Sequence, residues 1–175
     1  MLVFIKRPMT NKEFARVIER LQAKDIGALK ILYEQFFKRI YYTALGVVKS
    51  EHDAYDIAMN VIMKLVDYPS DPYQITNHIG LLITMTKNET KDFFRKCDGY
   101  VNVEDMEEIA VTDLKDKMWL YDILNELSDD EQELFIAHCI WGIKLKDVAL
   151  ESRKSYITVK RTYAGIKRKI QHLYS

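Results

Sequence analysis

Apolar residues recur at intervals of three and four along nearly the whole chain, and the strict alternation that is typical of strands is absent. This pattern predicts amphipathic helices. Residues 10–13 read Thr-Asn-Lys-Glu, a capping box, and predict the start of a first helix. A second helix is predicted over about 25–48, a third from the Ser-x-x-Asp start at Ser50, and a fourth over about 75–96, after a stretch with two prolines.

The helical pattern begins again near Lys117. A Ser-x-x-Glu start at Ser128 predicts a helix that ends at Gly142, and a short helix follows over 145–150. After a tight polar turn, Ser155 is the expected N-cap of the last helix. Its narrow apolar seam consists of Val159, Tyr163, Ile166, Ile170 and Leu173.

These elements predict an all-α protein with two parts. We expect a four-helix N-terminal domain over residues 1–96, a linker over 97–116, and a C-terminal domain over 117–175. Two helices joined by a few residues, the second of them basic and amphipathic, indicate that the C-terminal domain contains a helix-turn-helix.

The fourth predicted helix has two different faces. At about 100° per residue, one side is apolar and is expected to face the core: Ile79, Leu82, Ile83, Thr86, Phe93 and Phe94. The opposite side is expected to face solvent and carries amides, cations and one exposed leucine: Asn77, Leu81, Thr84, Asn88, Lys91, Asp92 and Arg95.

Charge is distributed unevenly along the chain. The whole chain has 26 basic and 26 acidic residues, yet residues 153–175 contain seven Lys and Arg and no acid, which leaves −7 on the rest. The linker has seven acidic residues against one lysine, and it is either a plain acidic linker or a segment that covers a basic surface. A concentrated positive segment in a neutral chain favours a polyanionic partner.

The basic helix has the chemistry of a DNA-reading element. With the seam buried, helical geometry directs Ile157, Thr158, Arg161, Ala164 and Arg168 outward; Lys160 and Lys167 flank them, and Arg153 and Lys154 lie in the turn. Cations neutralise phosphates, Arg161 has the geometry for a bidentate bond to guanine, and Ile157 and Thr158 suit a thymine methyl group. Complementing the helix dipole would explain the cations near the C-terminus of this helix, but it does not explain Arg153 or Lys160.

Other classes of protein are disfavoured. The two cysteines and four histidines form no spacing typical of a metal site or a catalytic set, so we expect no cofactor and no enzymatic activity. The apolar run at the start is too short for a secretory core, and no run approaches a membrane span. These features predict a cytoplasmic protein with no membrane partner.

Two stretches resemble a bacterial RNA polymerase sigma factor of the extracytoplasmic-function type. The pattern D-A-x-D-[LI] stands at 53–57, and N-x-x-x-D-x-x-R stands at Asn88, Asp92 and Arg95, as in the second region of that family. Leu127, Gly142, residues 147–149, Ser155 and residues 158–160 match its fourth region. The resemblance covers about 25–96 and 118–174. The chain departs from it at the turn, where Ser152 and Arg153 replace the usual Leu-Gly.

The resemblance implies partners and sites. RNA polymerase core would be bound by Asp53, Asp56, Asn60 and Lys64. The start-proximal promoter element would be contacted by Tyr73, Asn77, Asn88, Lys91, Arg95 and Lys96, with Tyr73 stacking on a flipped base. The upstream promoter element would be read by Arg153, Lys154, Ser155, Ile157, Thr158, Lys160, Arg161 and Arg168. The resemblance also leaves open an anti-sigma factor as a further partner.

Two alternatives to a sigma factor stay open at this point. A stand-alone helix-turn-helix regulator would bind duplex operator DNA without polymerase. A sigma-like protein-interaction module without promoter recognition would keep its activity after charge reversal at Lys160 and Arg161.

Overall fold

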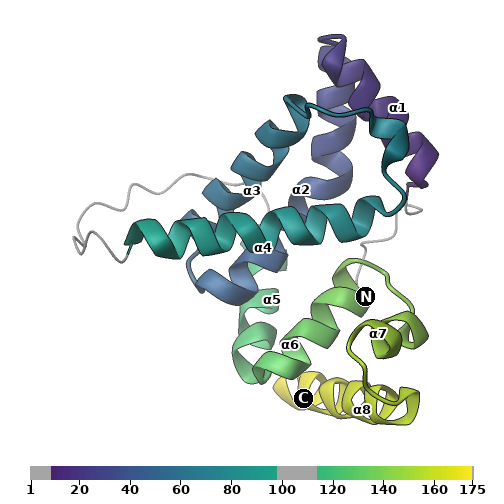
Figure 1. Ribbon diagram of the computed structural model, residues 1–175. Helices are drawn as coiled ribbons and strands as arrows, with labels where there is room; N and C mark the ends of the chain where they lie inside the picture. Colours follow the sequence, from purple (N-terminus) through teal and green to yellow (C-terminus); the bar gives the residue numbers. More distant parts are fainter. Residues whose placement is uncertain (1–8, 98–113, 175) are drawn as a thin grey trace. The chain divides into compact units, whose positions relative to one another are not determined.

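The computed structural model describes residues 9–97 and 114–174, and the contacts divide the chain into two units, Met1–Val101 and Asn102–Ser175 (Figure 1). In the described residues the chain is helical apart from the turns that join the helices, which confirms the all-α prediction. The predicted acidic linker lies mostly outside the described residues. Its last part, from residue 114, belongs to the first helix of the second unit.

The first unit contains α1 (Asn11–Gln22), α2 (Ile26–Val48), α3 (Glu51–Val66) and α4 (His78–Cys97), with a short 3-10 helix, η1 (Pro72–Gln74), before α4. The predicted starts of the first three helices are confirmed, because Thr10, Asp25 and Ser50 each accept a hydrogen bond from a backbone N–H of the following turn. Thr10 and Glu13 form the complete capping box.

The core of this unit lies where α2 packs against the other three helices, and α3 also packs against α4 (Figure 1). Fully buried aromatic and aliphatic side chains fill it: Phe14, Ile18, Leu32, Phe36, Ile40, Ile62, Leu65 and Leu82. Phe14 of α1 meets Phe36 of α2 edge to face, with ring centroids 5.5 Å apart. This burial is the main stabilisation of the four helices.

The predicted start of α4 and the predicted burial of Phe94 are wrong. The helix begins at His78 rather than near residue 75, because the Asn77 side chain accepts a hydrogen bond from the Gly80 N–H at 2.9 Å and so caps the helix. Phe94 shared the apolar side in the sequence pattern, yet it is 44% exposed in the last turn, where its ring meets Phe93 edge to face.

The second unit contains α5 (Leu114–Glu126), α6 (Asp129–Phe135), a π-helical turn η2 (Ile136–Ile140), α7 (Leu145–Glu151) and α8 (Tyr156–Leu173). Helix α8 packs against α5, α6 and α7. Ser128 and Glu131 form the predicted capping box of α6, and Gly142 adopts the left-handed conformation (φ 73°) that ends this segment. The expected single helix from 128 to 142 is instead an α-helix followed by a π turn.

The chain between α7 and α8 turns tightly over residues 152–155. Arg153 adopts the left-handed conformation (φ 53°), which is the conformation that a glycine would adopt most easily. The Ser152 hydroxyl donates to the Val148 carbonyl at 2.7 Å and closes the end of α7. The turn contains no glycine, and an arginine whose side chain is exposed adopts its left-handed position.

None of the helices in the described part of the chain is both long enough and apolar enough to cross a membrane.

Candidate nucleic-acid interface

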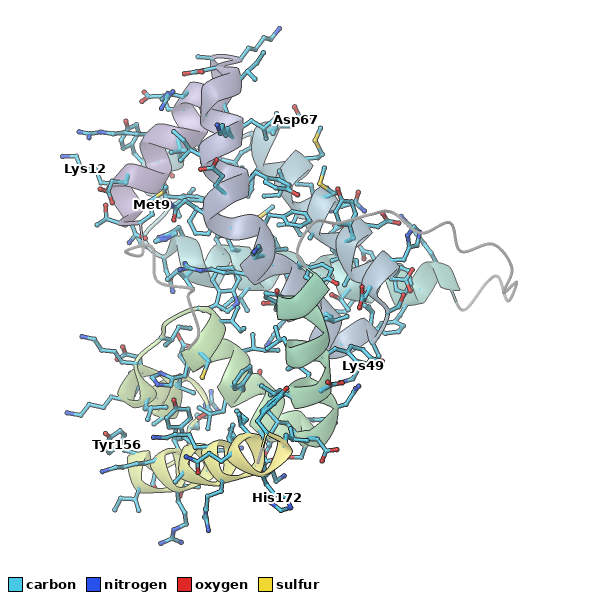
Figure 2. The ribbon with its side chains drawn as sticks, turned by 180° about the vertical axis from the view of Figure 1, so that it is seen from behind. Met9, Lys12, Lys49, Asp67, Tyr156 and His172 are labelled. Carbon is cyan, nitrogen blue, oxygen red and sulfur yellow. The ribbon has the colours of Figure 1, made fainter. Side chains whose placement is uncertain are left out.

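Helix α8 buries one narrow face and exposes the opposite one. Val159 and Ile166 are buried, while Tyr163 and Ile170 are half-buried and Leu173 is exposed, so the predicted seam is buried at Val159 and Ile166 and becomes exposed at the end of the helix. Arg161 and Arg168 follow those two buried residues by two positions, about 200° around the helix, and both are exposed. Figure 2 shows nitrogen-tipped side chains extending from α8 between the labelled Tyr156 and His172.

Two cations of the basic segment are already paired inside the unit. The Lys154 ammonium lies 2.7 Å from an Asp130 carboxylate oxygen, and the Lys169 ammonium lies 2.6 Å from a Glu131 carboxylate oxygen. The Lys169 ammonium and then the Ser128 N–H lower the pKa of Glu131, which keeps this carboxylate ionised. These pairs join the turn and the last part of α8 to the first turn of α6.

The remaining cations are differently placed. Arg153, Lys160 and Arg161 are exposed and form no ion pair with any residue that the structure describes. Lys167 lies over the Tyr163 ring, 4.9 Å from its centroid. Of the predicted DNA contacts in the turn, Arg153 is therefore available to phosphate, whereas Lys154 would first have to leave Asp130.

The start of α8 is arranged around its cap. The Ser155 hydroxyl oxygen accepts from the Thr158 N–H at 3.1 Å and lies 2.8 Å from the Thr158 hydroxyl. Both hydroxyl groups predicted to contact DNA are thus engaged with each other. The N–H groups of Tyr156 and Ile157 have no acceptor among the described residues, so they can bind an anion at the positive end of the helix dipole.

Helix α4 presents a second polar surface. Asn88, Lys91, Arg95 and Lys96 are exposed along its second half, and Leu81, expected to be exposed, is half-buried. Arg95 forms an ion pair with Asp92, and this pair lowers the pKa of Asp92. The surface keeps two lysines beside this neutralised pair, so it is more weakly positive than α8.

The other two residues predicted for this promoter element lie elsewhere. Asn77 caps the start of α4, roughly 27 Å along the helix from Arg95 at about 1.5 Å of rise per residue. Tyr73 lies in η1, where its ring is half-exposed and its hydroxyl donates to a Glu19 carboxylate oxygen at 2.8 Å. The structure therefore separates the predicted start-proximal residues into one group at each end of α4.

The residues predicted to bind polymerase follow one face of α3, because they are three and four positions apart. Asp56 and Asn60 are exposed, and Asp53 is half-buried in the first turn, where its N–H bonds to the cap Ser50. Lys64 differs from them, because its ammonium pairs with Glu89 of α4, a residue only 8% exposed. Lys64 is thus a link between two helices rather than a purely external contact.

Replacing Lys64 with methionine tests that link. Without the ammonium the Glu89 carboxylate is left buried and unpaired, so we expect the free energy of unfolding to fall by about 1–3 kcal/mol. Urea unfolding followed by circular dichroism measures the change. The double variant Lys64→Met with Glu89→Leu should recover most of it, while Lys91→Met, at an exposed lysine of the same unit, should change little. Equal stability of Lys64→Met and the native chain would contradict the structural role.

Sequence reasoning missed a buried polar cluster at the start of α4. His78 is 5% exposed, stacks on Phe14 with ring centroids 5.0 Å apart, and meets Phe36 edge to face. Its Nδ1 and its backbone N–H both bond to the Asn11 side-chain oxygen. Its Nε2 is buried and has no hydrogen-bond partner among the described residues. Burial and then the nearby Arg39 lower the pKa of His78, so the imidazole is neutral in the folded unit.

The lowered pKa of His78 predicts a pH dependence of stability. The unfolded chain takes up a proton on this histidine below about pH 6.5, whereas the folded unit resists it. The free energy of unfolding is therefore expected to be highest above that pH and to decrease as the pH falls below it. Urea unfolding at pH 7.5, 6.5 and 5.5 measures this, and His78→Phe should lessen the slope. His172→Gln, at an exposed histidine of α8 without an ion pair among the described residues, should keep it; an unchanged slope in His78→Phe would contradict the prediction.

Comparison with known proteins adds no family to this geometry: no protein-family model matches the chain, and no curated protein matches it significantly.

Proposed function

We propose that this protein is a promoter-recognition subunit of bacterial RNA polymerase, of the sigma-factor type. The observation that carries the proposal is the exposed cationic face of α8 in a helix-turn-helix arrangement, together with a second polar and cationic surface on α4 in a separate unit. Two separate DNA-facing helices suit a protein that contacts two promoter elements.

The exposed side chains of each unit suggest which partner that unit contacts. In the second unit, Arg153 and Lys160 neutralise phosphates while Arg161 reaches a base edge in the major groove. In the first unit, Asn88 and Lys91 meet the start-proximal element, and the exposed Asp56 and Asn60 of α3 dock on the polymerase core. The polymerase core supplies the chemistry of RNA synthesis, and the protein acts with it in the cytoplasm without catalysis of its own.

The test uses the full chain and the polymerase core of its host. We expect the chain to co-elute with core on size exclusion, and run-off transcripts to appear only when chain, core and a matching promoter are combined. Asp56→Arg with Asn60→Arg should abolish co-elution, while Lys12→Glu with Lys30→Glu, on exposed positions of α1 and α2, should preserve it. Absence of a complex between the native chain and core would refute the proposal.

A stand-alone DNA-binding regulator is the second candidate. It is favoured by one observation, that the whole cationic face of α8 and its turn belongs to one unit. Such a regulator would bind duplex DNA tightly without polymerase, whereas a promoter-recognition subunit needs core for firm binding and strand opening. Measuring duplex affinity with and without core therefore separates the two candidates.

A further inference from the structure

Three large apolar side chains are exposed on either side of the α7–α8 turn. Leu150, in the last turn of α7, is 81% exposed, and Ile157 and Tyr156, which open α8, are 70% and 42% exposed. A single exposed apolar residue is ordinary on a protein surface and needs no explanation. Three of them on two joined helix ends form a patch, and patches of this kind mark contact surfaces.

The three side chains lie at the two helix ends that the turn joins. The Lys146 ammonium of α7 lies 6.0 Å from the centroid of the Tyr156 ring, so this face of α7 meets the start of α8. Leu150 is one helical turn after Lys146 and therefore lies on the same face of α7. Ile157 directly follows Tyr156. We call Leu150, Tyr156 and Ile157 the turn patch.

The rim of the turn patch is mainly cationic. Lys146, Arg153, Lys160 and Arg161 are exposed around it, and the exposed acids beside it are Asp147 and Glu151 of α7. The unbonded N–H groups at the start of α8 add partial positive charge. The partner that fits is polyanionic and presents small apolar groups between its charges.

Duplex DNA has this composition in its major groove. Phosphates line both edges, and the C5 methyl of thymine is the apolar group on the base edges. Ile157 and Arg161 are one helical turn apart on the same face of α8, about 6 Å along the axis, so both can reach bases of one short site. An apolar face for a lipid surface would continue along the helix, but here a cation follows Ile157 after one turn.

Resting on the proposed function, we propose that the turn patch reads thymine methyl groups, with Ile157 as the main contact and Leu150 and Tyr156 closing over a neighbouring methyl. The DNA site would then contain thymine beside the guanine that Arg161 contacts. The chemical determinant is one methyl group per contacted base, which uracil lacks.

The test compares thymine with uracil in otherwise identical duplexes. Sites are first selected from a random duplex pool with the full chain, alone and with polymerase core. Each thymine of the selected site is then replaced by uracil. We expect one or two replacements to weaken binding about fourfold each, the loss that corresponds to one buried methyl. Ile157→Ala should weaken binding to the thymine duplex by a similar factor and be insensitive to uracil, whereas Val47→Ala, an exposed apolar position of α2, should behave as the native chain.

Each other outcome has a definite meaning. The inference is overturned if the thymine and uracil forms of the selected site bind with equal affinity, or if the selected site contains no thymine. Either result leaves the proposed function standing. If no DNA is selected, either with or without core, the proposed function is overturned as well. A third outcome is that the chain binds vesicles of one part phosphatidylserine to three parts phosphatidylcholine, that Ile157→Ala abolishes this binding, and that uracil has no effect on DNA binding. This result would assign the turn patch to a lipid surface and overturn the inference.

Discussion

Reversing two charges on α8, with Lys160→Glu and Arg161→Glu together, is expected to lower the affinity for selected duplex DNA about 100- to 1,000-fold at about 0.1 M salt. A bidentate arginine–guanine contact is worth about 1–3 kcal/mol, and each lost phosphate contact weakens binding further. Both side chains are exposed and without ion pairs in the described structure, so the fold of the unit should not change. Fluorescence anisotropy across a salt series measures both affinity and its salt dependence.

The matched control changes the same net charge elsewhere. Lys12→Glu with Lys30→Glu adds the same four negative units to exposed positions of α1 and α2, so it separates a local effect from a general repulsion of DNA. The logarithmic salt slope should become less steep by at least about one for the α8 variant, which loses the Lys160 phosphate contact, and stay unchanged for the control. If both double variants lose affinity equally, α8 is not the DNA-reading helix, and the protein-interaction alternative gains support.

Helical periodicity made the fold class predictable, since most helices of the chain have an apolar stripe and a polar cap at the start. Periodicity does not determine the exact end of a helix. The Asn77 side chain decides where α4 begins. The π turn η2 differs from an α-helix by less than one residue per turn, and a segment of five residues is too short for that difference in period to show in the sequence.

The exposed face of α8 was equally predictable, because a narrow seam leaves little freedom about which residues face outward. The partners of individual charges were not. Lys154 pairs with Asp130 across 24 positions and Lys64 with Glu89 across 25, and no local pattern encodes such pairs. The burial of His78 is similar, since it depends on Phe14 and Asn11 of α1. Sequence reasoning therefore identified the cations, but only the structure separates those that are available from those that are already paired.

The largest effect on stability is expected at Phe14, which is fully buried and contacts both Phe36 and His78. Phe14→Ala removes a ring from a close-packed core and should lower the free energy of unfolding of the first unit by about 3–5 kcal/mol, a large part of the total for a small domain. Both tryptophans, at 119 and 141, belong to the second unit, so far-UV circular dichroism follows both units and tryptophan fluorescence follows one.

The outcome of Phe14→Ala should therefore depend on the probe. We expect urea unfolding by circular dichroism to begin at a lower concentration, while the tryptophan transition stays where it is in the native chain. Phe94→Ala is the matched control, because it removes the same ring from a position of the same unit that is 44% exposed, and it should cost less than about 1 kcal/mol. Equal losses for the two variants would contradict the position of Phe14 in the core. A tryptophan transition that moves with Phe14→Ala would instead show that the two units unfold as one, since a core defect in the first unit can reach that probe only through coupling.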